Sequence, residues 1–256
     1  MDSITFAVIT KNEERNVADC LAQGTWADEI LVLDSGSVDR TVEIARQFTS
    51  AVYQHPFRSF PHQRNAALRL ATSDWVLFVD ADERVTPELR QEIQSLLANR
   101  TAEETGEAPP LGYWIPRRNI IWGKWIRRGG WYPDYQLRLL RREGATYDEA
   151  REVHELVKLA GPAGHLQHPF VHFNYDTVSQ FIAKQRAYSS FDARMLHASG
   201  QRAKWRSFVL QPLRAIKRRY WDLQGYRDGG HGLLLAVLLA CYEVVVYWRL
   251  RRLDGA

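Results

Sequence analysis

Two carboxylates separated by a single residue follow a short apolar run in the first third of the chain. Asp80 and Asp82, with Ala81 between them, come directly after the apolar residues 75–79. Carboxylates at this spacing, at a turn beyond a buried strand, repel each other unless a cation lies between them. Mg²⁺ and Mn²⁺ bind such oxygens and share them with a diphosphate. The spacing predicts a divalent-cation site; an acidic turn or a helix cap before Pro87 is the structural alternative.

Two further polar segments follow apolar runs, Thr10 to Glu13 and Asp34 to Ser37. Ligands of parallel sheets bind beyond the carboxyl ends of the strands, so these segments are expected at the same site. Asp34, at the tip of its strand, is expected to remain free to accept a hydrogen bond from a ligand such as the imide N–H of uracil. Ser37 or Asp39 is expected to cap the next helix. No GxGxxG or GxxxxGK[ST] motif occurs, so neither a dinucleotide fold nor a P-loop is supported.

The elements that would position these residues alternate along the first 82 residues. Apolar runs rich in β-branched residues predict strands, and segments with helical spacing separate them. We expect strands over 4–10, 29–34, 51–54 and 75–80, and helices over 12–23, 39–48 and 62–70. This alternation predicts an α/β fold with a mostly parallel central sheet flanked by helices.

The second part of the chain has a different pattern. A polar loop over 101–110 precedes strand-like segments rich in aromatic residues, and helices are expected over 176–197 and 205–223, before an apolar stretch over 232–248. We therefore expect one domain over 1–175, made of two halves, 1–100 and 111–175, and a basic helical extension over 176–256. In the second half, Trp122, Trp125, Trp131 and Tyr132 are suited to stacking on a saccharide or to core packing.

Composition narrows the class of protein. The chain has 256 residues, of which 25% are charged and 12% aromatic, so it is neither disordered nor fibrous. Cys20 and Cys241 are its 2 cysteines and have no metal-ligand spacing, which argues against a disulfide framework and a zinc site and favours a reducing compartment. The first residues lack the pattern of a secretory signal.

Charge is distributed unevenly. Between Lys184 and Arg252 there are 14 Lys and Arg against 4 Asp and Glu, whereas the rest of the chain has 20 against 26. A basic end predicts contact with an anionic surface, either membrane or nucleic acid. Over 205–223 the apolar residues share one helical arc, which predicts a helix in the headgroup plane with Pro212 as a kink. Glu243 interrupts the stretch 232–248 and argues for a buried or interfacial helix, with packing onto the catalytic domain as the alternative.

Four segments carry a family resemblance: ITKNEE, VLDSGSVDRT, QRNAAL and VLFVDADE. Together they resemble the nucleotide-binding half of family 2 glycosyltransferases with the GT-A fold. The later segment IPRRNIIWGKWIRRGGWYPDYQLRLLRR, followed by VHE, is similar to the bacterial lipopolysaccharide core β-1,4-glucosyltransferase group within that family. The similarity extends over essentially the whole chain.

The resemblance implies a role for individual residues of this sequence. Thr10, Asn12 and Glu13 would line a uridine pocket, with Asp34 facing the base. Arg64 would contact the base or the diphosphate, and Arg138 would stabilise the leaving group. Asp80, Ala81 and Asp82 would contact the donor sugar, Asp80 and Asp82 would hold the metal, and Gly130 would lie beneath that sugar. His154 and His172 are two candidates for a histidine at the metal or the diphosphate.

The resemblance also implies a catalytic base. An inverting transfer needs a carboxylate that accepts the proton of the acceptor hydroxyl. Asp134 occupies the position at which the family places this acid, and Glu155 in the segment VHE is the competing candidate. A structural Asp134 that caps the next helix is the alternative.

Together these patterns predict an inverting glycosyltransferase that requires Mg²⁺ or Mn²⁺. It would move a hexose, with glucose from UDP-glucose expected, onto a lipid-linked saccharide such as lipopolysaccharide inner core, and would be cytoplasmic and peripheral to the inner membrane. A sugar nucleotidyltransferase, or transfer to another lipid-linked or protein acceptor, is the alternative. Nucleic acid is not an expected partner, because an acidic crevice repels phosphate when no metal is bound.

Overall fold

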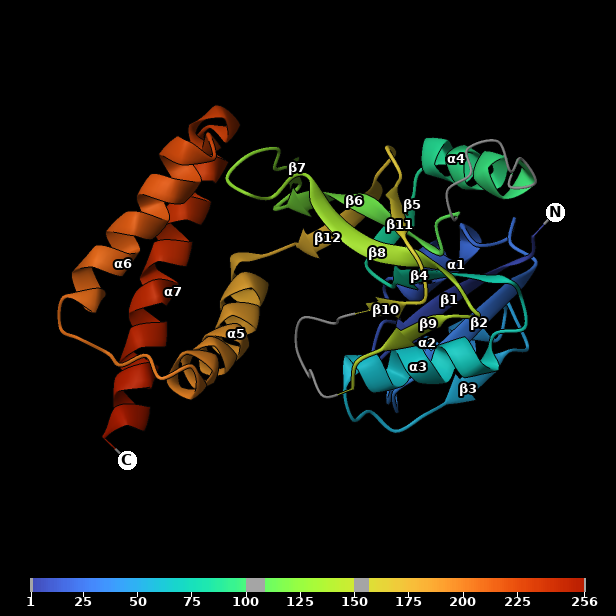
Figure 1. The fold of residues 1–256 in the computed structure, drawn as a ribbon, viewed down its shortest axis with the longest axis horizontal. Helices are drawn as coiled ribbons and strands as arrows, with labels where there is room; N and C mark the ends of the chain where they lie inside the picture. Colours follow the sequence, from blue (N-terminus) through green and yellow to red (C-terminus); the bar gives the residue numbers. More distant parts are fainter. Residues whose placement is uncertain (1, 100–108, 150–156, 256) are drawn as a thin grey trace. The chain divides into compact units, whose positions relative to one another are not determined.

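The chain folds into two compact units. The computed structural model describes residues 2–99, 109–149 and 157–255 (Figure 1). Unit 1 consists of Met1–Arg117 and Tyr135–His172, and unit 2 of Arg118–Asp134 and Phe173–Ala256. Unit 2 therefore contains the expected helical extension and, in addition, a segment between the two parts of unit 1. Each unit is described by itself below.

The first four strands of unit 1 are parallel. They are β1 (Ile4–Thr10), β2 (Glu29–Asp34), β3 (Val52–Gln54) and β4 (Trp75–Asp80), in the order β3-β2-β1-β4. In their register Thr10 pairs with Asp34, and Ile9 pairs with Asp80. The carboxyl ends of β1, β2 and β4 therefore meet at one edge of the sheet, as the parallel arrangement requires.

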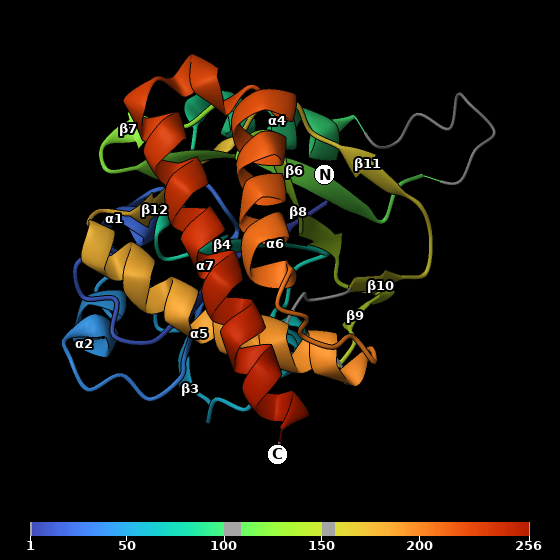
Figure 2. The same cartoon turned by 90° about the vertical axis from the view of Figure 1, so that its left-hand side faces the viewer.

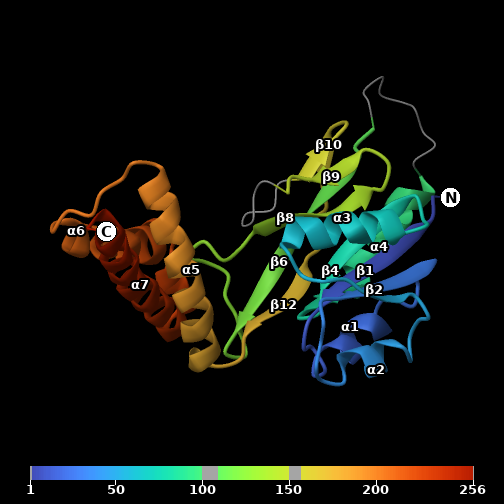
Figure 3. The same cartoon turned by 90° about the horizontal axis from the view of Figure 1, so that it is seen from below.

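Helices cover both faces of these strands. Helices α1 (Val17–Ala22), α2 (Thr41–Ala45) and α4 (Pro87–Ala98) pack on one face, and α3 (Phe60–Leu70) packs on the other. Figure 3 shows α1 and α2 on one side of the strands and α3 on the other. Because successive strand residues point to opposite faces, Phe6 and Trp75 belong to the first core and Leu31 and Phe78 to the second. All four side chains are fully buried, and each stabilises the sheet by roughly 1.5–3 kcal/mol.

The later strands extend the sheet beyond β4 in the order β4-β8-β6-β12-β5, with β7 and β11 paired to β6. Strand β8 is antiparallel to β4, and β5 is antiparallel to β12. A separate antiparallel pair is formed by β9 and β10. The bounds are β5 (Glu83–Val85), β6 (Gly112–Ile121), β7 (Lys124–Trp125), β8 (Asp134–Arg141), β9 (Ala145–Tyr147), β10 (Val157–Leu159), β11 (Ala163–His165) and β12 (Phe170–Tyr175).

Unit 2 contains the long helices of the carboxyl-terminal part. Helix α5 (Val178–Ala198) begins with a capping box between Thr177 and Gln180. Helix α6 (Ser207–Ile216) contains Pro212, runs into a π-helical segment (Lys217–Asp222), and is followed by a 3₁₀ helix (Gly225–Asp228) and α7 (Gly230–Asp254). Helices α6 and α7 lie side by side (Figures 1 and 2), joined by the apolar contacts of Phe208 with the Val246–Leu250 region.

Candidate functional site

Asp80, the last residue of β4, is held by two arginines. Its Oδ1 accepts hydrogen bonds from Arg64 Nη2 at 3.1 Å and from Arg138 Nη1 at 3.2 Å, and its Oδ2 accepts one from Arg138 Nη2 at 2.5 Å. The contact with Arg138 is bidentate, the geometry in which a guanidinium binds a carboxylate most strongly. Both arginine side chains are buried, whereas the Asp80 side chain is 31% exposed. These three residues are hereafter called the arginine clamp.

Two different elements bring the arginines to Asp80. Arg64 lies in α3, where its guanidinium packs 5.1 Å from the ring centre of Phe78. Arg138 lies in β8, and the antiparallel pairing of Leu77 with Leu139 brings it next to the end of β4. Both carboxylate oxygens of Asp80, a predicted metal ligand, thus contact guanidinium groups, and its role at the metal stays a prediction.

Asp82 is next to a histidine. Its Oδ2 lies 3.5 Å from Nε2 of His172, and the His172 side chain is buried. The antiparallel pairing of β5 with β12 causes this contact, because it places His172 opposite Glu83. Between the two acids, Ala81 is buried and its carbonyl oxygen accepts a hydrogen bond from Arg84 Nη1 at 2.8 Å. Of the two predicted acids, Asp82 is therefore the one beside a second potential metal ligand.

The Asp82 and His172 pair suits a divalent cation that takes further ligands from its substrate. A carboxylate oxygen and an imidazole nitrogen fit Mn²⁺, and a single carboxylate also suits Mg²⁺ that keeps its waters. Across the described ranges, no group of three or more His, Cys, Asp or Glu residues is placed to hold a metal ion. The predicted candidate His154 lies outside the described residues. The fit of this site to a divalent cation thus depends on two protein ligands among the described residues, Asp82 and His172.

Glu83 follows Asp82 and is completely buried. Its Oε2 accepts a hydrogen bond from the main-chain N–H of Asp80 at 3.0 Å, and its Oε1 lies 3.3 Å from Arg117 Nη1. Burial, followed by the nearby Asp80 carboxylate, raises the pKa of Glu83 to about 8, while Arg117 opposes this shift. The buried Glu83 carboxylate therefore fixes the main chain at the start of the turn that carries Asp82.

Asp34 is buried within its own turn. Its carboxylate accepts hydrogen bonds from Thr10 Oγ1, from the main-chain N–H of Gly36 and from both the N–H and the hydroxyl of Ser37, at 2.5–3.2 Å. The prediction that this side chain remains free for the base of a nucleotide is therefore wrong for this structure. The φ of +85° at Gly36 shows why the turn needs glycine.

The segment after β1 is joined to the turn after β2. The main-chain N–H of Asn12 donates to Ser37 Oγ at 2.8 Å, and that of Glu13 donates to Thr41 Oγ1 at 2.7 Å. Asn12 Oδ1 in turn accepts from the N–H of Val38 at 2.9 Å. The structure thus brings Thr10, Asn12 and Glu13 together with the Asp34 turn at the edge where β1 and β2 end, as predicted.

Asp134 and Gly130 belong to unit 2. One carboxylate oxygen of Asp134, Oδ2, accepts a hydrogen bond from Asn119 Nδ2 at 3.2 Å, and the same amide nitrogen donates to the carbonyl of Trp131 at 2.9 Å. Asp134 begins strand β8, so it does not cap a helix. Gly130 is exposed and has a φ of +84°. The competing candidate Glu155 lies outside the described residues.

Two of the four aromatic residues singled out by the sequence pack into an apolar cluster. Trp122 and Trp131 pack against the apolar cluster that contains Tyr175 and Phe181. Guanidinium groups lie 4.4 Å and 4.1 Å from the ring centre of Trp125, and the Tyr132 ring meets it edge-on at 5.5 Å. Of the two roles that the sequence allowed, core packing describes Trp122 and Trp131.

Sequence reasoning missed two residues that support the site. Asn65, next to Arg64, binds the main chain of Tyr147 in both directions, at 2.8 Å and 3.0 Å, and so attaches α3 to β9. Arg117 pairs with the buried Glu83. No local signal predicts either contact, because each joins segments that are far apart in the sequence.

Comparisons with known proteins identify the relatives of this chain. Residues 5–104 match the family model described as glycosyl transferase family 2. The chain is 27% identical over 241 residues to the lipopolysaccharide core biosynthesis glycosyltransferase LpsC of Rhizobium meliloti (strain 1021), covering 92% of this chain and 87% of that relative.

Solved structures also match. TarS 1-349 of S. aureus, in complex with UDP, is 12% identical with a TM-score of 0.48, covering 99% of this chain and 92% of that one. Glucosyl-3-phosphoglycerate synthase from Mycobacterium tuberculosis, in complex with Mn²⁺, UDP and glucosyl-3-phosphoglycerate, is 20% identical with a TM-score of 0.37, covering 46% of this chain and 44% of that one.

Proposed function

We propose, from the premise that this chain is a family 2 glycosyltransferase with the GT-A fold, that it moves a hexose from a UDP-sugar onto a lipid-linked saccharide. The observation that carries the proposal is the pair of Asp82 and His172 beside the arginine clamp, at the end of a buried parallel strand. The family match also decides between the two enzyme classes that the sequence left open, in favour of a glycosyltransferase rather than a sugar nucleotidyltransferase.

On the donor side, Asp82 and His172 are the residues that would hold a divalent cation. When bound, the cation would supply positive charge to the diphosphate that leaves with the nucleotide. Asp80 fixes the two guanidinium groups of the clamp, and we assign to Arg64 and Arg138 the stabilisation of negative charge on the leaving group. Asp80 is thus a positioning residue in this proposal.

On the acceptor side, Asp134 is the proposed base. It would accept the proton of the acceptor hydroxyl while the oxygen attacks the anomeric carbon from the face opposite the diphosphate, which inverts the configuration. The hydrogen bond from Asn119 fixes Oδ2 of this carboxylate. Glu155 is the alternative base.

The name of one relative supports the acceptor class. LpsC is named for lipopolysaccharide core biosynthesis, which supports a lipid-linked saccharide as acceptor, with the lipopolysaccharide inner core as the first candidate. We propose UDP-glucose as the donor. Transfer to another lipid-linked saccharide or to a protein is the alternative.

A thermal-shift panel tests the donor class. We expect UDP-glucose with Mn²⁺, at about 100 times its Kd, to stabilise the protein by about 2.7 kcal/mol, which corresponds to a rise in Tm of roughly 5–10 °C. GDP-, ADP- and dTDP-sugars serve as controls, and EDTA should remove the shift. Equal stabilisation by every nucleotide sugar, or stabilisation by nucleoside triphosphates alone, would contradict the proposed donor.

The helical extension supports a location at the cytoplasmic face of the inner membrane. In the segment 205–222, which starts two residues before α6 and includes the π-helical segment, large apolar side chains are exposed, among them Trp205 at 78%, Leu213 at 58% and Trp221 at 62%. Arg206, Arg214, Lys217 and Arg218 are exposed on the same segment. Within the described part of the chain, α7 is the one helix long and apolar enough to cross a membrane, and a third of its most apolar window is buried in the protein. We propose peripheral binding through α6.

Vesicle flotation tests this location. We expect the wild type to float with vesicles of equal parts phosphatidylcholine and phosphatidylglycerol, and the double variant Trp205→Ser/Leu213→Ser to bind at least roughly tenfold more weakly, because two apolar side chains no longer enter the bilayer. Met195→Ser removes a similarly exposed side chain from α5 and should bind like the wild type. Unchanged flotation of the double variant would contradict the role of α6.

A further inference from the structure

An indole ring in unit 2 lies between two guanidinium groups. The Cζ atoms of Arg118 and Arg127 are 4.4 Å and 4.1 Å from the ring centre of Trp125. A guanidinium that stacks on an aromatic ring keeps its in-plane N–H groups directed outward, where they can bind an oxyanion. Arg118 Nε makes no hydrogen bond within the described structure, so stacking is what holds this side chain.

These charges are not neutralised by acidic side chains. Within residues 2–99, 109–149 and 157–255, no ion pair joins a carboxylate to Arg118, Arg127 or Arg128. Lys124, in β7, donates from Nζ to the carbonyl oxygen of Asp228 at 2.8 Å. Four cations thus lie within eleven residues of the sequence, which raises the local positive potential and attracts an anion.

Residues 126–129 are called the loop below. The buried acid Asp228 binds main-chain N–H groups of this loop instead of its guanidinium groups. The Asp228 carboxylate is buried and accepts hydrogen bonds from the N–H groups of Arg127 at 3.2 Å and Arg128 at 2.7 Å. These bonds occupy the Asp228 carboxylate with main-chain N–H groups. The guanidinium groups of Arg127 and Arg128 can therefore bind an external ligand.

Further bonds hold the loop in this shape. The N–H of Gly129 donates to the carbonyl of Leu223 at 2.9 Å, and Arg219 Nη1 donates to the carbonyl of Gly129 at 3.2 Å. At the other end, the N–H of Ile126 donates to the carbonyl of Asn119 at 3.0 Å. A site that is already ordered loses less conformational entropy on binding, which favours a ligand-binding role.

We propose that Arg118, Lys124, Arg127 and Arg128 form a binding site for a phosphate group carried by the acceptor saccharide. The inference rests on the proposed transfer to a lipid-linked saccharide and adds that this acceptor is phosphorylated. The site belongs to the same unit as Asp134, and Ile126, next to Arg127, donates its N–H to the carbonyl of Asn119, whose amide holds the Asp134 carboxylate. A phosphate anchored here would orient the saccharide that presents its hydroxyl to the base.

Calorimetric titration of the full chain tests the site. The probes are a bisphosphorylated glucosamine disaccharide, its unphosphorylated parent, inorganic phosphate, and phosphatidylglycerol vesicles. We expect the bisphosphorylated disaccharide to bind at least roughly tenfold more tightly than its parent, and Arg127→Gln/Arg128→Gln to lose that difference. Arg127→Lys should retain part of it, because charge remains while the guanidinium fork is lost. Arg194→Gln removes one exposed charge from α5 and should behave like the wild type.

Three results would overturn the inference. The first is equal affinity of the wild type for the two disaccharides. The second is an Arg127→Gln/Arg128→Gln variant that binds the disaccharides like Arg194→Gln. The third is that Arg127→Gln/Arg128→Gln loses vesicle binding without any effect on disaccharide binding, which would make bilayer lipid the ligand. Unchanged circular dichroism and Tm of each variant exclude misfolding. UDP-glucose binding by the wild type is measured in the same samples; its absence would count against the proposed function, whereas the disaccharide comparison still decides on the phosphate site.

Discussion

Replacing Asp82 by asparagine is expected to lower the rate of sugar transfer by a factor on the order of 100 to 1,000, and to abolish the dependence of UDP binding on Mn²⁺. Asp82 is the carboxylate beside His172, at 3.5 Å, so its neutral amide would leave the imidazole as the remaining protein ligand. Loss of one preorganised electrostatic contact to a developing anion has effects of this size. The initial rate of UDP release, with and without Mn²⁺, is the measurement.

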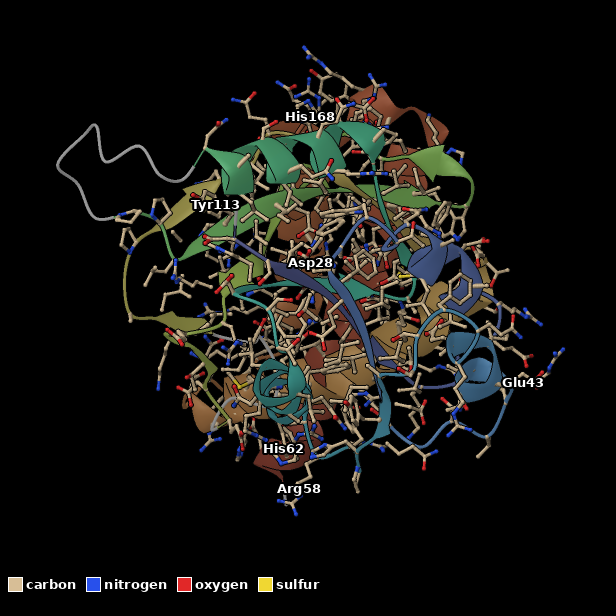
Figure 4. All side chains as sticks on the ribbon, turned by 90° about the vertical axis from the view of Figure 1, so that its right-hand side faces the viewer. Asp28, Glu43, Arg58, His62, Tyr113 and His168 are labelled. Carbon is tan, nitrogen blue, oxygen red and sulfur yellow. The ribbon has the colours of Figure 1, made fainter. Side chains whose placement is uncertain are left out.

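Two controls make the Asp82 result specific. Glu43→Gln changes a carboxylate to an amide on the outward side of α2 (Figure 4), where its partner is the exposed Arg40, and transfer should be unchanged. Asp80→Asn should weaken the arginine clamp and so slow transfer, yet retain Mn²⁺-dependent UDP binding. If Asp80→Asn loses the metal dependence and Asp82→Asn keeps it, the assignment of the metal ligand is reversed.

Asp134→Asn is expected to lower transfer by a factor on the order of 100 to 10,000 with little change in UDP affinity, because the amide cannot accept the proton of the acceptor hydroxyl. The variant keeps an oxygen that can accept the hydrogen bond from Asn119, so the local structure should remain. Single-turnover transfer and UDP titration are measured on the same sample.

The alternative base provides the comparison for Asp134. Glu155→Gln should retain most of the transfer rate, and Asp176→Asn, an exposed acid of unit 2, should retain all of it. A Glu155→Gln variant that loses transfer with normal UDP binding, together with an active Asp134→Asn variant, would identify Glu155 as the base.

The sequence predicts the strands that carry the site closely. The apolar runs 4–10, 29–34 and 75–80 have the same bounds as β1, β2 and β4. Strands that are buried on both faces need an unbroken apolar run, and that run ends where the polar site begins. The α/β class and the edge at which the polar segments gather follow from this pattern alone.

The first helix next to the site was predicted too long. A helix was expected over 12–23, but α1 spans Val17–Ala22. The main-chain N–H groups of Asn12 and Glu13 are held by side chains of the neighbouring turn, and Asn12 has a φ of +57°, which a right-handed helix does not allow. Helical spacing reveals which residues face the core, whereas these contacts come from another part of the chain.

The residues that contact Asp80 and Asp82 are brought there by strand pairing, which local sequence patterns do not predict. The arginine clamp requires β8 to pair antiparallel with β4, and the contact of Asp82 with His172 requires β5 to pair with β12. The sequence therefore identified the correct residue types at the tip of β4 but gave Asp80 and Asp82 the same role. Burial of Asp34 within its own turn likewise depends on Thr10 and on the fold of 34–37.

We predict that Asp82 and His172, rather than Asp80, bind the divalent cation that contacts the nucleotide diphosphate. Pulsed electron paramagnetic resonance of Mn²⁺ bound with UDP measures this most directly, because a directly bound imidazole nitrogen modulates the spin echo. We predict a nitrogen modulation in the wild type and in Asp80→Asn that disappears in His172→Gln. A spectrum without that modulation, or one that persists in His172→Gln, would contradict the account.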